Sequence, residues 1–220
     1  YVTEPSRREI RRQARLERER ARAVHKMTKS ENLVFWKEYL DHFHYVINVP
    51  DFWRLLDHVY GVLGTLTDGE LILDAGCGNG TFGYYFLTNQ IYRRRITSGE
   101  GSRAPRYVGL DFVPTALREA GRSFRHLKLS QTDGCTVGTP TLAAMACESL
   151  CQADLNVSLP FQNDMFDRVV CNLVVGYLDD PLKTIREFVR VLVPGGRLIV
   201  TNLKPQSDLT QIYRNFFSMA

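Results

Sequence analysis

The sequence predicts one α/β domain with a mainly parallel sheet, and three observations lead to that fold class. Short apolar runs alternate with longer amphipathic stretches, the order that parallel strands joined by right-handed helical crossovers require. The run LILDAGCGNG, which begins at Leu71, is a strand that leads into glycines. The stretch 168–175 is apolar almost throughout, as a strand covered on both faces must be. A chain of 220 residues, 44% of them hydrophobic, can bury one sizeable core.

Two helices are expected before the first strand. In the stretch 31–47, apolar residues recur every three or four positions, which predicts a helix with a core-facing stripe of Trp36, Leu40, Phe43 and Ile47. Pro50 opens a second helix that closes near Gly61 and Gly64. Its apolar positions are Phe52, Leu55, Leu56, Val59, Tyr60 and Leu63.

The first half of the sheet is built from strand, glycine turn and helix. A helix is expected to start near Gly80, after the strand that begins at Leu71. A second strand covers 107–111 and leads through Pro114 to a helix around 116–123. A third strand ends near Asp154.

The second half repeats the alternation. After the fourth strand, 168–175, Asp180 and Pro181 form a good N-cap and first-turn pair. They open a helix whose inward residues are expected to be Ile185, Phe188, Val189 and Leu192. Pro194, Gly195 and Gly196 stop that helix, and 197–201 forms a fifth strand. The polar stretches 92–106 and 125–146 are interpreted as surface insertions.

The glycine turn predicts a nucleotide-like ligand. Glycines at 76, 78 and 80 let the backbone bend sharply, and the following helix offers unpaired N–H groups to a carboxylate or phosphate. The dinucleotide fingerprint G-x-G-x-x-G is not met, because its third glycine would have to stand where Thr81 stands. An NAD-dependent oxidoreductase is therefore disfavoured.

Two carboxylates narrow the class of ligand that the glycine turn predicts. Asp74 precedes the glycines, and Asp111 closes the second strand, where a carboxylate can accept hydrogen bonds from both hydroxyls of a ribose. Taken singly, Asp111 is equally well read as an ordinary cap at a strand end, and so is Asp154 farther along the chain. Together with the glycines they describe an adenosine pocket.

The segments DAGCGNG at 74–80 and YVGLD at 107–111 resemble the first two motifs of the class I S-adenosylmethionine (SAM)-dependent methyltransferases. The resemblance continues in the family's order through ADLN at 153–156, LPF at 159–161, FD at 166–167 and LVPGG at 192–196. It implies a Rossmann-like core that binds SAM, and it is closest to the small-molecule branch, similar to the quinone and lipid methyltransferases. The family normally adds two more strands, so the chain, ending at Ala220 in the expected fifth crossover helix, is interpreted as a fragment.

The resemblance also implies roles for individual residues. Gly76, Cys77, Gly78 and Gly80 would form the turn that borders the methionine part of SAM, and Asp74 would help to hold its ammonium group. Asp111 would take the ribose and Phe112 would lie against the adenine. Asp154 and Leu155 would contact the adenine edge, and Asn172 would line the pocket near the sulfonium and the acceptor.

No catalytic residue is assigned, because methyl transfer depends chiefly on alignment of the two reactants. The candidates for a base, if one is needed, are His42, His44, Tyr45, His58 and Tyr177. The segment NLVV at 172–175 departs from the Asn/Asp-Pro-Pro-Tyr signature of the related amino methyltransferases, which disfavours nucleobase and protein amide acceptors. An aromatic cluster fits either a lid over an apolar or phenolic acceptor or a plain helix-packing stripe; its members are Phe35, Trp36, Tyr39, Phe43 and Tyr45.

Charge and composition divide the chain. The net charge is +4, yet residues 1–30 alone hold ten Lys and Arg against four Asp and Glu. We expect a basic arm over 1–30, a helical cap over 31–66, the SAM-binding core over 67–204 and the start of a crossover helix over 205–220. The arm is read first as solvated, with a contact to nucleic acid or an anionic surface as the alternative. A non-catalytic SAM-binding scaffold docked through this arm is the alternative function.

The sequence has no apolar run long enough to cross a bilayer and no signal peptide, so a cytoplasmic location is expected. Five cysteines without a CxxC pair predict neither a disulfide framework nor a metal site.

Overall fold

The structure is a computed structural model that describes residues 15, 27–41, 47, 49–67, 69–97, 105–129 and 148–204. Five strands form one sheet in the order β3-β2-β1-β4-β5, and every neighbouring pair is parallel. The strands are β1 (Leu71–Ala75), β2 (Arg106–Asp111), β3 (Glu148–Gln152), β4 (Phe166–Asn172) and β5 (Leu192–Thr201). The predicted fold class is confirmed. The order reverses between β1 and β4, the position at which doubly wound sheets bind ligands.

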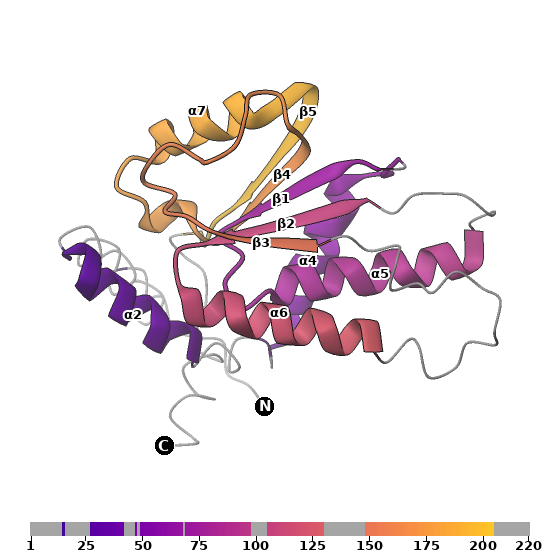
Figure 1. The fold of residues 1–220 in the computed structure, drawn as a ribbon, viewed down its shortest axis with the longest axis horizontal. Helices are drawn as coiled ribbons and strands as arrows, with labels where there is room; N and C mark the ends of the chain where they lie inside the picture. The colour runs from indigo at the N-terminus through magenta and orange to yellow at the C-terminus, as the bar shows by residue number, and fades with distance from the viewer. Residues whose placement is uncertain are drawn as a thin grey trace.

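Helices cover both faces of the sheet (Figure 1). They are α2 (Lys29–Asp41), α4 (Pro50–Leu63), α5 (Thr81–Thr97), α6 (Pro114–Leu129) and α7 (Pro181–Val191), with a short 3-10 turn, η2 (Val175–Tyr177). In the figure α7 lies on one side of the sheet, and α5 and α6 lie on the other. Helix α2 lies beyond one end of the strands, where it contacts α6.

Side-chain alternation along β1 divides the core into two clusters. Leu71, Leu73 and Ala75 pack with α7 through Phe188 and Val191. Ile72 points the other way and packs against apolar residues of α4, α5 and α6, among them Leu56, Phe86 and Phe124. Asp74 comes two residues after Ile72 in the strand, so its side chain points to the same face of the sheet, toward α5 and α6.

Several predicted boundaries differ from the observed ones. Helices α5 and α6 continue to Thr97 and Leu129, into the stretches interpreted as insertions, because those segments begin with helix-forming residues that extend the preceding turns. In α7 the Asp180 N-cap is confirmed by a hydrogen bond from the Lys183 N–H. Val189, however, is 59% exposed, and Val191 takes the inward position.

The fourth strand is shorter than predicted and the fifth is longer. β4 ends at Asn172 because Leu173 has a positive φ of 61°, which turns the chain out of the sheet and into η2. β5 begins at Leu192, and its pairing with β4 shifts register before Arg197, so Pro194 and the two glycines lie in an irregular part of the strand.

The predicted core-facing stripe is only partly confirmed, because Ile47 packs against the core but α2 ends before it, at Asp41. None of the residues of α2 is buried, and Trp36, Tyr39 and Leu40 line a cavity instead of the core. Phe43 and the rest of 42–46 lie outside the described residues, as do most of 1–30, all of 205–220 and the insertion residues 98–104 and 130–147. Among the residues that the structure does describe, no helix is long and apolar enough to cross a membrane.

Candidate functional site

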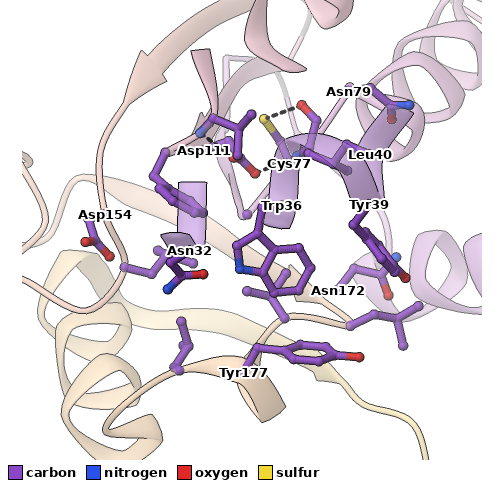
Figure 2. Close-up of a pocket in the computed structure, with 18 of the residues that line it drawn as sticks. Asn32, Trp36, Tyr39, Leu40, Cys77, Asn79, Asp111, Asp154, Asn172 and Tyr177 are labelled. Carbon is purple, nitrogen blue, oxygen red and sulfur yellow. Dashed lines mark hydrogen bonds between the residues drawn. The ribbon is translucent and has the colours of Figure 1, made fainter. Parts of the chain in front are cut away.

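A cavity of about 550 Å³ lies at the carboxyl ends of β1, β2 and β4, with α2 across it (Figure 2). Nine of the ten predicted site residues line it, namely Asp74, Gly76, Cys77, Gly78, Asp111, Phe112, Asp154, Leu155 and Asn172. The tenth, Gly80, does not. A Cβ at Gly80 would stand 2.7 Å from the Ala120 Cβ, so this glycine allows α6 to pack closely against the turn.

The glycine turn is bent back onto β2. The N–H groups of Gly76 and Cys77 both donate to the Leu110 carbonyl, at 2.7 and 2.9 Å. Gly76 has a φ of 83°, and a Cβ there would lie 2.6 Å from a methyl group of Val174. Only glycine combines this conformation with this approach, so the turn forms a wall with no side chain at that point.

Asp111 is held rigidly at the end of β2. Its Oδ2 accepts from the Gly78 N–H and its Oδ1 accepts from the Val113 N–H, both at 2.9 Å. Burial raises the pKa of Asp111, and the backbone N–H groups oppose that rise. Each carboxylate oxygen retains acceptor capacity, so the pair can still receive two hydroxyl hydrogens from a ligand.

Asp74 is deeper, with 1% of its surface exposed. The Tyr107 hydroxyl donates to its Oδ2 at 2.6 Å. Burial raises the pKa of Asp74 to about 7, while the hydrogen bond from Tyr107 lowers it and the nearby Asp111 raises it further. A carboxyl in this position gains most from a ligand that brings a positive charge.

The side of the cavity next to β3 has a flat apolar surface and a polar edge. Leu155 is buried and Phe112 is half-buried, and both line the cavity. The Asp154 Oδ1 accepts from the Asn156 N–H at 2.9 Å, which is a local turn and agrees with the capping interpretation of this residue. Asp154 also lines the cavity, so the cap and a ligand contact are compatible.

The opposite wall is aromatic. The rings of Trp36 on α2 and Tyr177 on η2 meet edge to face, with centroids 4.9 Å apart. Tyr39 and Phe35 pack against Trp36 in the same manner, at 5.3 and 5.2 Å. Figure 2 shows Trp36 between Tyr177 and the Asp111 side of the cavity. Of the predicted aromatic cluster, Trp36 and Tyr39 line the cavity and Phe35 packs against Trp36, while Phe43 and Tyr45 lie outside the described residues.

Asn172 stands between the two walls. The Thr201 hydroxyl donates to its Oδ1, and the Leu173 N–H donates to the same hydroxyl at 3.2 Å. Because Thr201 receives one hydrogen and gives its own, the carbonyl end of the Asn172 amide is fixed on Thr201. Its NH₂ end is thus available to a ligand in the cavity.

The candidate bases are only partly placed. Tyr177 lines the cavity, whereas His58 is exposed on α4 and is absent from the described lining. His42, His44 and Tyr45 lie outside the described residues.

Tyr107 and Thr201 are functional candidates that the sequence did not reveal. A signal for Tyr107 was present: it pairs in register with Ile72, so it faces the same side of the sheet as Asp74. Thr201 pairs with Asn172 across strands that were predicted with different bounds.

Comparison with known proteins decides the family. Residues 73–200, more than half of the chain, match the family model described as "Methyltransferase domain". The chain belongs to the class I SAM-dependent methyltransferase family. Its cofactor is SAM, as the resemblance implied.

The individual relatives are distant. The biotin biosynthesis bifunctional protein BioHC of Teredinibacter turnerae is 28% identical over 140 residues, 63% of this chain and 20% of that protein. The human probable tRNA methyltransferase 9B is 26% identical over 135 residues, 60% of this chain and 21% of that protein. The chain thus matches about a fifth of the length of each of these curated relatives. A SAM-dependent methyltransferase from Aquifex aeolicus is 19% identical over 68% of this chain and 64% of that one, with a TM-score of 0.48.

The residues present fit SAM. The cavity volume of about 550 Å³ lies within the roughly 300–1,000 Å³ that is typical of small-molecule sites. Asp111 offers two fixed oxygens to a diol, and Phe112 and Leu155 offer an apolar surface to a flat ring. Four aspartates and one lysine line the described part of the cavity, a charge balance that suits a cationic ligand; they are Asp74, Asp111, Asp154, Asp179 and Lys29.

Proposed function

We propose that this chain transfers the methyl group of SAM to a small, largely apolar acceptor with a flat ring, such as a phenol. One observation carries the proposal: the two walls of a single cavity differ in chemistry. The carboxylates and glycines lie at the strand ends, and the aromatic residues of α2 and η2 lie opposite them. The first wall suits the cofactor and the second suits an apolar ring.

SAM, when bound, supplies a methyl group on a positively charged sulfur that is transferred by in-line displacement. The protein holds the ribose through Asp111, the adenine between Phe112 and Leu155, and the ammonium group near Asp74. Trp36 and Tyr177 hold the acceptor ring, and α2 excludes water from that side. Alignment of this kind can contribute roughly 7–11 kcal/mol to lowering the barrier, so a base is helpful without being required.

Asn172 supports an acceptor that carries an oxygen. Its carbonyl is taken by Thr201, so its N–H groups are the ones left for a ligand. An N–H group favours a hydroxyl, phenolate or carbonyl oxygen over a protonated amine, which has no lone pair to offer.

Asp111→Ala tests the cofactor half of the proposal. We expect the affinity for SAM, measured by calorimetry, to fall roughly 100-fold, because two hydrogen bonds to a charged group are lost. Asp51→Ala is the matched control, since Asp51 is exposed on α4 and absent from the described lining of the cavity. Equal affinities in the two variants would contradict the assignment.

Trp36→Ala tests the acceptor half. We expect SAM affinity to change less than threefold while methyl transfer to a panel of small phenols, followed with radiolabelled SAM, falls at least tenfold. Loss of SAM binding with no change in transfer per bound cofactor would contradict an acceptor role for the aromatic wall.

The same assay separates the enzyme from a SAM-binding scaffold. A scaffold transfers no label to any phenol or cell extract, and its function depends on the basic arm. Removal of residues 1–26, which spares the cavity-lining Lys29 and the start of α2, leaves methyl transfer unchanged if the arm is only a solvated extension.

A further inference from the structure

Asp74 is a buried carboxyl without a described cationic partner. The titratable groups that face it are Tyr107 and Asp111 from β2, Cys77 from the glycine turn and Cys171 from β4. None of them carries a positive charge in any protonation state. An isolated buried carboxylate is costly, so the neutral carboxyl is favoured until a cation enters the cavity.

Core packing holds the Tyr107 side chain in position next to the Asp74 carboxyl. The side chain is wholly buried, and its ring stacks on Phe86 and meets Phe124 edge to face. A Cβ at Gly83 of α5 would lie 2.6 Å from the Tyr107 hydroxyl oxygen, so the absence of a side chain there makes room for it. The ring therefore cannot move away without repacking the core, and its hydroxyl points at Asp74 Oδ2.

No hydrogen bond is described to the other oxygen, Oδ1, and Asp74 lines the cavity. We infer that Tyr107 is a positioning residue for the ammonium end of SAM: it fixes the Asp74 carboxyl, which gives up its proton when the cofactor binds. The inference rests on the proposed function, because it takes SAM as the cationic ligand. Tyr107 itself lies behind Asp74 and is absent from the described lining of the cavity.

The consequence is a cofactor affinity that depends on pH. The pKa of Asp74 stands at about 7, so most molecules carry this proton at pH 6. The ammonium group binds the carboxylate, so the proton must leave, and affinity falls tenfold for each pH unit below the midpoint. An α-amino group is still mostly protonated below about pH 7.5, so that window reports Asp74 and not the ligand.

Tyr107 sets the midpoint. Its hydrogen bond lowers the pKa of Asp74 against the effect of burial. In Tyr107→Phe the ring packing is kept and only this donor is lost, so the midpoint of the affinity profile moves to higher pH. At pH 7 the affinity for SAM falls by about tenfold for each pH unit of that displacement.

The experiment is calorimetry of SAM binding to the intact chain at pH 5.5–7.5, in buffers with different ionisation enthalpies. The slope of the observed enthalpy against the buffer's ionisation enthalpy counts the protons released. We expect roughly one proton at pH 6 and about half at pH 7 in the wild type. In Asp74→Asn we expect weak binding, no proton release and no slope of affinity with pH.

Tyr85→Phe is the matched control. The Tyr85 hydroxyl also donates to an aspartate, Asp57, but this pair is outside the described cavity lining. The same atom is removed, and we expect the wild-type midpoint and proton count. A shift that Tyr85→Phe shares with Tyr107→Phe would overturn the assignment.

The outcomes separate the role of Asp74 from the methyltransferase activity. SAM that binds with a flat pH profile and no proton release overturns this inference and leaves the proposed function standing. No SAM binding at any pH overturns both. Should Tyr107→Phe fail to fold, the proton count of Asp74→Asn against the wild type decides whether Asp74 is the group that titrates.

Discussion

At the scale of single residues, the glycine turn combines two constraints that can be measured separately. Gly76 has a positive φ, which any residue with a Cβ adopts at a cost, and it lies against Val174 with no room for a methyl group. Gly69 has a similar φ of 79°, but a Cβ at that position would meet nothing within 4 Å. The two glycines therefore differ only in crowding.

Gly76→Ala is expected to lower the free energy of unfolding by about 2–5 kcal/mol, the sum of backbone strain and overpacking. Gly69→Ala is expected to cost only the strain, about 1–2 kcal/mol. Both are measured by urea unfolding. Combining Gly76→Ala with Val174→Ala relieves the crowding, so the double-mutant cycle should show favourable coupling of about 1–3 kcal/mol. Strict additivity would mean that Val174 does not limit the turn.

At the scale of elements, α7 is fastened to the segment that follows the adenine side of the cavity. Arg190 donates to the carbonyls of Leu159 and Phe161, to Asn163 and to both oxygens of Glu187. Glu187 in turn accepts from the Leu159 N–H. A planar guanidinium can reach all these acceptors from one position.

Arg190→Lys keeps the charge and removes this fork, because an ammonium group cannot span the same acceptors. We expect a loss of about 1–3 kcal/mol in the free energy of unfolding, since charge-assisted hydrogen bonds to the backbone are broken. Hydrogen exchange of the amides in 159–163 should accelerate. Arg186→Lys is the control, being exposed on the same helix. Unchanged exchange in Arg190→Lys would show that packing alone holds the segment.

Elements and site were predictable to different degrees. The strands and the turn were readable because apolar runs, glycines and Asp111 have local signatures. The end of β4 was not, because Leu173 leaves the sheet through a positive φ that its sequence type disfavours. The surroundings of α2 were predicted incorrectly, because the spacing of Trp36 and Leu40 indicates that one face of the helix is covered but does not indicate which part of the molecule covers it.

The site's supporting residues show the same limit. Tyr107 acts through a hydrogen bond to Asp74, 33 positions away in the sequence. Thr201 acts through a hydrogen bond to Asn172, 29 positions away. Such pairs depend on strand register and on depth in the core. A local pattern contains neither, so only the three-dimensional structure connects these residues to the site.

At the scale of the whole molecule, an ionisable group in the core makes the free energy of unfolding depend on pH. The pKa of Asp74 is 3.8 in its ordinary state and about 7 in the fold, raised mainly by burial. Between these values the folded chain holds a proton that the unfolded chain has released. The stability contributed by this proton is therefore complete below about pH 4 and is lost as pH rises through 7.

Asp74→Asn removes this dependence while keeping an oxygen that accepts from Tyr107. We expect the ligand-free variant to gain stability relative to the wild type as pH rises from 5 to 8, by an amount on the order of a few kcal/mol. Urea unfolding of both proteins at the two pH values measures it, and all other groups cancel in the comparison. Saturating SAM should favour the wild type at pH 8, because only the carboxylate pairs with the ammonium group and bound ligand stabilises the folded state. A difference between the two proteins that is equal at pH 5 and pH 8 would mean that Asp74 is charged throughout, and the cavity would then need a cation from elsewhere in the chain.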